Sequence, residues 1–178
     1  MVRELEPYGL MFIEEPVLPQ HNEALREIAA AGTTPIATGE RMFTRWEFKQ
    51  LLTAGYVDVI QPDISHAGGI FEMRLLGAEA EARHIGFCPH NPSGPVANAA
   101  TLQLAACVPN LVILEMMMTD VPFRRDVCDE KLVVRKDGTM EIPDRPGIGI
   151  DLDEAELLKH PYVRTELRHY RGDLTNIR

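Results

Sequence analysis

Residues 35–63, with the sequence PIATGERMFTRWEFKQLLTAGYVDVIQPD, decide the fold class. Two short, largely apolar runs, Pro35–Thr38 and Val57–Ile60, enclose the amphipathic stretch Arg45–Ala54. Runs of this length are typical of strands buried on both faces of a parallel sheet. The stretch between them has the length and apolar spacing of a helix. We therefore predict a strand–helix–strand unit here.

The same alternation continues on both sides of this unit. Further strands are predicted at Gly9–Ile13, Ile85–Cys88 and Leu111–Leu114, and further helices at Asn22–Ala31, Ile70–Arg83 and Pro95–Cys107. Alternation of this kind indicates βα units and a parallel sheet. A complete (β/α)₈ barrel needs about 250 residues, and this chain has 178. The predicted fold class is therefore α/β: a partial TIM-type barrel of about five βα units with a small C-terminal appendage.

The alternation stops after residue 118. A hairpin is predicted around Asp137-Gly138, followed by an irregular Pro- and Gly-rich loop and a short helix near Asp153–Lys159. We accordingly expect two parts, a barrel part at residues 1–118 and a C-terminal segment at residues 119–178.

Composition excludes several classes of partner. The formal net charge is −9 and no Lys/Arg cluster occurs, which argues against nucleic acid and gives no basis for attraction to an anionic membrane. No apolar run reaches the roughly 18 residues of a membrane-spanning helix. The three cysteines lack any paired motif, so we interpret them as buried small apolar residues in a reducing, cytoplasmic protein.

One side chain capable of chemistry follows each predicted strand: Glu14, Glu40, Asp63, His90 and Glu115. Successive members are 23 to 27 residues apart, which is one βα unit. Because all strands of a parallel array point the same way, these five groups should gather at the C-terminal strand edge, where such folds place their active sites.

Four acids and an imidazole on one edge cost stability through repulsion and desolvation. A hard divalent cation such as Mg²⁺, held by oxygen ligands, relieves that cost and polarises a substrate carboxylate. His90 could be oriented by Asp63 and act as a general base. The pattern therefore favours removal of a proton alpha to a carboxylate, through an enediolate.

Motifs at these strand ends resemble the mandelate-racemase branch of the enolase superfamily: Phe12-Ile13-Glu14-Glu15-Pro16, Ala37-Thr38-Gly39-Glu40-Arg41, Gln61-Pro62-Asp63 with Ser65-His66-Ala67-Gly68-Gly69-Ile70, and Pro89-His90-Asn91-Pro92-Ser93-Gly94-Pro95. The resemblance runs from about Gly9 to Glu115 and is closest to galactonate dehydratase and related acid-sugar dehydratases. It implies that residues 1–118 form the C-terminal half of an enolase-type barrel. Residues 119–178 would then pack on a capping domain.

The resemblance also implies a role for each residue. Glu14 and Glu40 would be Mg²⁺ ligands, and His90, paired with Asp63, would remove the C2 proton. Glu115 would hydrogen-bond the substrate carboxylate and the developing enediolate. The implied reaction is a hydro-lyase reaction, loss of water from an aldonic (sugar) acid such as galactonate to give a 2-keto-3-deoxy acid.

The sequence departs from the family pattern upstream of Glu14, where the family has three further barrel strands and a capping domain. The family's third metal ligand is an Asp on the strand before Glu14, often within Asp-x-His, and no such motif occurs in the 13 residues before Glu14. Two alternatives therefore remain open, an inactive truncated piece and an acid-sugar racemase or epimerase. The exposed apolar strand edges favour a homo-oligomer. Glu15 should face away from Glu14 and be structural, and His66 is either a substrate contact or a loop residue.

Each candidate also has a plain structural interpretation. Glu14 and Glu40 could be solvated residues at strand ends, and Glu115 a hydrogen-bonded carboxyl with no chemical part. Asp63 could cap a helix. His90 could belong to a turn.

Overall fold

The computed structural model describes residues 1–117, 122–129 and 132–164. Its centre is a four-stranded parallel sheet whose strands follow one another in chain order: β1 (Ile13–Glu14), β2 (Ile36–Thr38), β3 (Val59–Ile60) and β4 (Gly86–Phe87). The predicted α/β class with parallel strands is confirmed.

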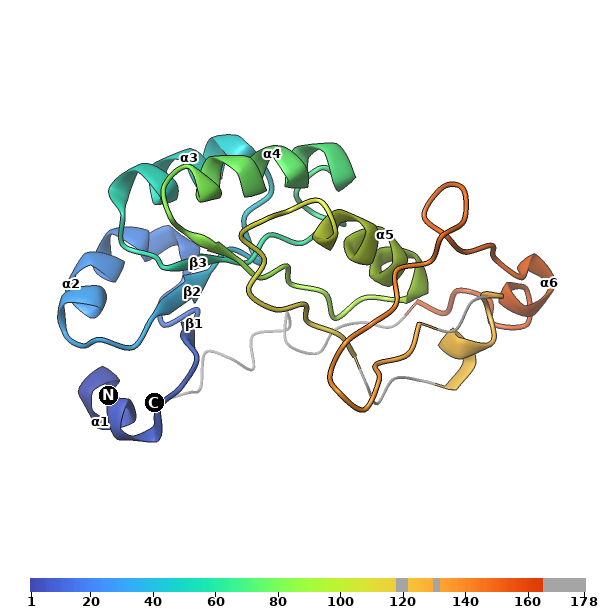
Figure 1. Ribbon diagram of the computed structural model, residues 1–178, viewed down its shortest axis with the longest axis horizontal. Coiled ribbons are helices and arrows are strands. Elements are labelled where there is room, and N and C mark those ends of the chain that lie inside the picture. The colour runs from blue at the N-terminus through green and yellow to red at the C-terminus, as the bar shows by residue number, and fades with distance from the viewer. Residues whose placement is uncertain (118–121, 130–131, 165–178) are drawn as a thin grey trace.

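Each strand is followed by helix, and the helices α3 and α4 lie together along one side of the sheet (Figure 1). The connecting elements are η2 (Pro19–Ala24), α2 (Leu25–Ala30), α3 (Arg45–Ala54), α4 (Gly69–Glu81) and α5 (Pro95–Ala105). The bounds of α3 are those predicted from the sequence. The other predicted helices are present but differ at their ends.

Alternate strand residues face opposite sides of the sheet, as the pleat requires. Ile36, Ile60 and Phe87 face the helices, where they join a core that includes Leu25, Phe48, Leu52, Met73, Leu76 and Leu104. The other face carries a smaller buried cluster of Ala37, Val59 and Cys88, with Phe12 packed against it. The strands are therefore covered on both faces, which explains their largely apolar sequences.

The predicted fifth strand, Leu111–Leu114, is reduced to a single parallel bridge between Phe87 and Leu111. Val112 N–H donates to the Phe87 carbonyl at 2.8 Å, and no further ladder bond follows in the described residues. Leu111, Val112 and Ile113 are 37–46% exposed. The prediction was wrong in extent because an apolar run extends a strand only where a neighbour pairs with it or a layer covers it.

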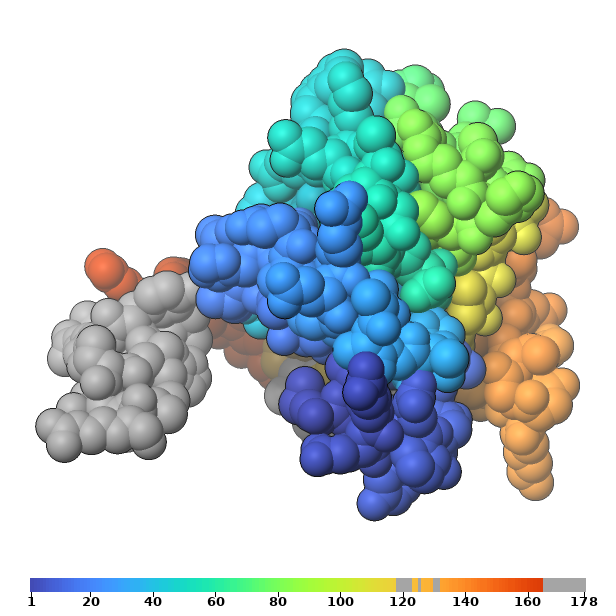
Figure 2. Space-filling model, turned by 90° about the vertical axis from the view of Figure 1, so that its left-hand side faces the viewer, coloured from blue at the N-terminus to red at the C-terminus, as the bar shows by residue number. Residues whose placement is uncertain are grey.

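The chain before β1 is helical rather than extended. The strand predicted from Gly9 begins only at Ile13, and the residues before it form α1 (Val2–Leu5) and η1 (Glu6–Tyr8). Arg3 Nε donates to the Ala31 carbonyl at 2.8 Å, which holds α1 against the connection between α2 and β2. Figure 2 shows this N-terminal segment packed directly below the α2 region.

The C-terminal part lies beyond α5 in Figure 1 and contains η3 (Pro122–Arg125) and α6 (Glu154–Leu157). The predicted hairpin is present as an antiparallel bridge between Val134 and Met140. Asp153 caps α6, its side chain accepting from Glu156 N–H at 2.9 Å. The predicted boundary at residue 118 lies outside the described residues and stays a prediction. No helix in the described part of the chain is long and apolar enough to cross a membrane.

Gly39 connects the end of β2 to Glu40 through a backbone that only glycine tolerates. Its φ is +142°, and a Cβ there would lie 2.8 Å from Phe48 Cε1 and 3.0 Å from Gln61 N. Phe48 of α3 and the backbone of Gln61, which follows β3, thus leave no room for a side chain at this position. The position of Glu40 depends on that close packing.

We expect Gly39→Ala to lower the free energy of unfolding by about 3 kcal/mol, because it adds a steric clash to an unfavourable positive φ. Gly55→Ala is the matched control, since Gly55 also has a positive φ (+68°) but nothing within 4 Å of its Cβ position. That control should cost about 1 kcal/mol. Urea denaturation of both variants checks the difference, and equal losses would contradict it.

Candidate active site

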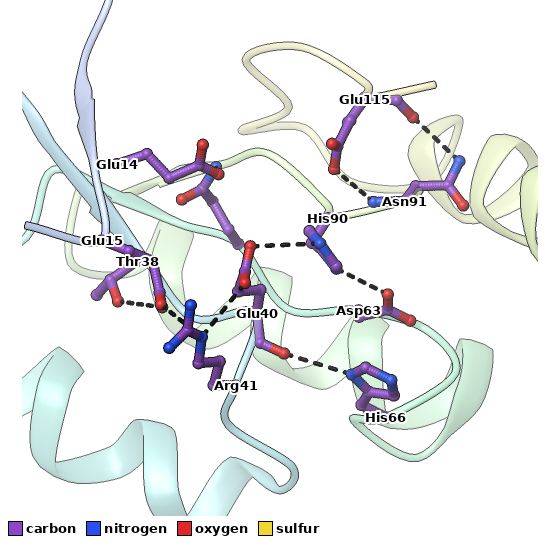
Figure 3. Close-up of polar contacts among 11 residues, drawn as sticks. Glu14, Glu15, Thr38, Glu40, Arg41, Asp63, His66, His90, Asn91 and Glu115 are labelled. Atoms are coloured by element: carbon purple, nitrogen blue, oxygen red, sulfur yellow. Dashed lines mark hydrogen bonds and ion pairs between the residues drawn. The ribbon is translucent and has the colours of Figure 1, made fainter. Parts of the chain in front are cut away.

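The polar residues at the ends of the strands lie at one edge of the sheet, and Figure 3 shows their contacts in close-up. Glu14 ends β1, Glu40 follows β2, and Asp63 and His90 follow β3 and β4. An isolated parallel bridge between Asp63 and His90 continues the pairing of β3 with β4 past the ends of both strands. The backbone therefore places these two side chains next to each other.

His90 is held by a buried carboxylate. Its Nδ1 lies 2.8 Å from Asp63 Oδ2, and Asp63 is only 2% exposed. The second oxygen, Oδ1, accepts from Ser65 N–H at 2.7 Å, which fixes the plane of the carboxylate. Asp63 thus stabilises its own turn and also orients the imidazole, but it does not cap α4, whose N-cap is Gly68 with no side-chain cap bond. The remaining ring nitrogen, Nε2, faces Glu40.

Glu40 is the meeting point of several contacts. One of its oxygens, Oε2, lies 3.3 Å from His90 Nε2, and the other, Oε1, accepts from Arg41 Nε at 3.4 Å. His66 Nδ1 lies 3.3 Å from the Glu40 carbonyl oxygen. The His66 ring is exposed and packs near Phe43, with ring centroids 5.6 Å apart. His66 therefore borders the site from the loop that precedes α4.

Glu14 is held by Gln61, a residue of the Gln61-Pro62-Asp63 motif for which the sequence predicts no role. Gln61 Nε2 donates to Glu14 Oε1 at 2.6 Å, and Gln61 is 4% exposed. Its own Oε1 is buried without a hydrogen-bond partner. The signal in the sequence was an amide directly after a predicted strand, at the same edge as the acids.

Cys88 lies next to Gln61, on the face of the sheet that carries Ala37 and Val59. Burial raises the pKa of its thiol to about 11, while a hydrogen bond from Gln61 partly opposes that rise. The negative charges of Glu115 and Glu14 raise the pKa a little further. The thiol is therefore protonated at neutral pH and behaves as a small apolar group.

Glu115 is tied to the loop after β4. Its Oε2 accepts from Asn91 N–H at 2.7 Å, and its carbonyl accepts from Asn91 Nδ2 at 3.0 Å. Asn91 is 1% exposed and directly follows His90. These two bonds bring the segment beyond the short bridge at Leu111 back to the site.

Glu15 makes contacts that its place after a strand does not predict. It has a φ of +41°, and its side chain is 11% exposed. Thr38 Oγ1 donates to its Oε1 at 3.0 Å, and Arg41 Nε lies 3.0 Å from its Oε2. A left-handed backbone breaks the strand alternation, so the side chain reaches across to Thr38 at the end of β2 and to Arg41 beyond it.

The donor set at this edge fits part of a magnesium shell. Glu14 and Glu40 offer carboxylate oxygens, the ligands that Mg²⁺ prefers, and Mg²⁺ commonly keeps several waters. Within the described ranges no three His, Cys, Asp or Glu side chains converge in a way that could hold a metal ion. By residue type, Glu14 and Glu40 would supply two oxygen ligands, with the remaining positions left to water or substrate.

A parallel α/β layer with acids and a histidine at consecutive strand ends defines part of a βα-barrel protein with its site at the C-terminal strand edge. The family model described as "Enolase C-terminal domain-like" matches residues 1–156. The chain belongs to this family, and its fold is that of a partial enolase-type barrel.

Curated relatives share about two fifths of their residues with the chain over the matched part. One is the "D-galactonate dehydratase" of Xanthomonas axonopodis pv. citri, 42% identical over 165 residues, which are 89% of this chain and 43% of the relative. Another is the "D-galactonate dehydratase" of Ralstonia pickettii, 41% identical over 167 residues, or 89% of this chain and 43% of the relative. The chain thus spans less than half the length of these relatives.

Solved structures match over nearly the same region. A putative mandelate racemase/muconate lactonizing enzyme from Burkholderia SAR-1 is 36% identical with a TM-score of 0.88, covering 93% of this chain and 41% of the other. A putative dehydratase from Salmonella enterica serovar Typhimurium is 30% identical with a TM-score of 0.83, covering 89% of this chain and 39% of the other. Both agree with the partial barrel described above.

The three cysteines differ in exposure, so the expectation that all are buried was wrong. Cys88 is buried, Cys107 is exposed and Cys128 is intermediate, and no disulfide joins these three described residues. Cys107 lies two residues beyond the end of α5, in the turn that leads to the buried Val108, and its own side chain faces solvent. An apolar residue type does not by itself specify burial at a helix end.

We expect iodoacetamide at pH 8 to modify Cys107 at least about 100-fold faster than Cys88, because the raised pKa of Cys88 leaves about 100-fold less thiolate and burial blocks access. Peptide mass spectrometry over time measures both rates. In denaturing urea the two rates should converge. Similar rates in the folded protein would contradict the buried position beside Gln61.

Proposed function

We propose that the protein acts in the Mg²⁺-dependent dehydration of an aldonic acid, such as galactonate, to a 2-keto-3-deoxy acid. Relatives named "D-galactonate dehydratase" at 41–42% identity support a lyase of this class. Because the chain covers 43% of those relatives, the activity of the whole protein is part of the proposal.

The observation that carries the proposal is the orientation of His90. With Asp63 accepting from Nδ1 at 2.8 Å, the proton on the ring is kept on Nδ1, and Nε2 is left to accept another. Nε2 faces the strand-end edge, where the carboxylates Glu14 and Glu40 also lie. A substrate bound at this edge would place its C2 proton before a base that is already oriented.

Glu14 and Glu40 are the residues that would hold Mg²⁺. When bound, the cation would stabilise negative charge that develops on the substrate carboxylate. Gln61 keeps Glu14 in place by donating to one oxygen, which leaves the other oxygen for a ligand. In this role the two carboxylates bind and orient, while His90 moves the proton.

Glu115 and His66 would contact the substrate. Glu115 is positioned by two hydrogen bonds with Asn91, and in this proposal it binds the substrate carboxylate. His66 is exposed beside Glu40, which suits contact with a hydroxyl of a polyhydroxy acid. The loop before α4 and the segment after Leu111 would thus both contact the substrate.

The reaction balances without a redox partner. His90 Nε2 takes the proton from C2, and the C2–C3 double bond forms as the C3–O bond breaks. The protonated His90 then gives that proton to the departing hydroxyl, which leaves as water, and the imidazole returns to its neutral form. The resulting enol becomes the 2-keto-3-deoxy acid by moving its own hydroxyl proton to C3. A racemase or epimerase would share the first step but would return a proton to C2 and keep the hydroxyl.

We also propose a cytoplasmic protein that forms a homo-oligomer and binds neither nucleic acid nor membrane. The charge of −9 and the absence of a basic cluster in the sequence support the exclusions. Self-association is supported by the apolar residues Leu111, Val112 and Ile113, which are 37–46% exposed beside β4. Sedimentation measures the oligomeric state.

We expect the protein with Mg²⁺ to form a 2-keto-3-deoxy acid from at least one member of an aldonic acid panel. His90→Asn should reduce that rate by at least about 100-fold, because the general base is lost. The semicarbazide assay for 2-keto acids measures the product. His21→Asn is the matched control, since His21 is exposed and pairs only with Glu23 at 4.0 Å.

Two results would count against the proposal. An unchanged rate in His90→Asn would remove His90 from the chemistry. Formation of a C2 epimer with no 2-keto acid from any substrate would replace dehydration by epimerisation. Chiral chromatography of the recovered substrate distinguishes the two reactions.

A further inference from the structure

Arg41 lies between two glutamates, Glu40 at the strand-end edge and the largely buried Glu15. Its Nε–H donates to Glu40 Oε1 at 3.4 Å and lies 3.0 Å from Glu15 Oε2 (Figure 3). Glu15 Oε2 is a buried atom that receives no directed hydrogen bond, so its contact with Arg41 is an ion pair. The directed N–H bond goes to Glu40, while Glu15 supplies the charge that holds the guanidinium in place.

Glu15 adopts an unfavourable backbone conformation to make this contact. A residue with a side chain at a φ of +41° is strained by about 1 kcal/mol or more. The strain is held by the Glu15 N–H bond to the Ala37 carbonyl at 2.9 Å and by the Thr38 hydroxyl at 3.0 Å. An ordinary strand end has no such strained residue. The strain at Glu15, which directly follows Glu14, therefore indicates a role for its contact with Arg41.

The Glu40 carboxylate has one side-chain contact for each oxygen. Its Oε2 lies 3.3 Å from His90 Nε2, and because the side chain is 24% exposed, the contact of Oε1 with Arg41 is the second restraint on the carboxylate. The Arg41 bond to Oε1 fixes the other oxygen and with it the plane of the carboxylate. A fixed plane matters for a cation ligand because partners that orient the ligand tune metal affinity.

We propose that Glu15 and Arg41 form a positioning pair that orients Glu40 for binding a divalent cation. This inference rests on the proposed function, in which Glu40 is a cation ligand. Neither Glu15 nor Arg41 contacts the cation or the substrate in this arrangement. Their effect passes through the carboxylate of Glu40.

The sign of the effect separates positioning from simple electrostatics. Arg41 carries a positive charge, so its removal strengthens the binding of a nearby cation if charge alone acts. Positioning predicts the opposite, because Glu40 loses its orientation. Glu15 provides a second test of positioning. Because its effect on Glu40 passes through Arg41, replacing Glu15 should change nothing further once Arg41 has been replaced.

The test uses Mn²⁺ as the probe, with free Mn²⁺ measured by electron paramagnetic resonance during titration of the intact chain. We expect Arg41→Met and Glu15→Gln each to weaken Mn²⁺ binding by about 10-fold, the scale for loss of a ligand-orienting contact. The double variant should be no weaker than either single variant. Arg45→Met is the matched control, because Arg45 pairs with Glu72 at 3.4 Å between α3 and α4, and its affinity should be unchanged.

Glu40→Gln distinguishes failure of this inference from failure of the proposed function. If Glu40→Gln weakens binding while Arg41→Met binds Mn²⁺ equally or more tightly, the positioning pair is refuted and the cation site stands. If the unmodified chain does not bind Mn²⁺, or Glu40→Gln has no effect, both are refuted. Additive losses in the double variant also refute the pair. The thermal unfolding midpoint is measured for every variant. Weaker Mn²⁺ binding supports the pair when the midpoint differs from that of the unmodified chain by no more than it does in Arg45→Met.

Discussion

The parallel hydrogen bonds between β1, β2, β3 and β4 are the constraint on which the site depends. They pair each strand with the next in chain order, so the residue that follows each strand is delivered to the same edge. The bridge between Asp63 and His90 extends this pairing into the loops, and the 2.8 Å bond between the side chains follows from it. The core on the helix side supports the register, since Ile36, Ile60 and Phe87 are at most 1% exposed.

The gathering of acids at this edge has an energetic cost that the protein offsets locally. Three carboxylates of the site each have a donor: Gln61 for Glu14, the adjacent Arg41 for Glu40, and Asn91 for Glu115. Hydrogen bonds and an ion pair of this kind stabilise carboxylates that would otherwise repel one another. The same donors fix the directions of the oxygens. The contacts that lower the cost of the site are therefore also those that shape it for a ligand.

Much of this arrangement could be predicted from the sequence, because periodicity and strand-end spacing depend on local residues. The bounds of α3 and the residues after β1 to β4 followed from that pattern. The fifth strand did not, because Leu111 and its neighbours need a partner to remain extended. The positive φ of Glu15 and its contact with Arg41 are set by tertiary packing, which residue spacing does not encode. The roles of the site residues remain predictions.

The central claim is that His90, oriented by Asp63, removes the proton next to a substrate carboxylate. Incubation of galactonate with the protein and Mg²⁺ in D₂O tests it most directly, with the C2 proton followed by nuclear magnetic resonance. The account predicts that the C2 proton signal is lost much faster than with His90→Asn, either by exchange or by dehydration. A signal that decays at the same slow rate with both proteins would contradict it.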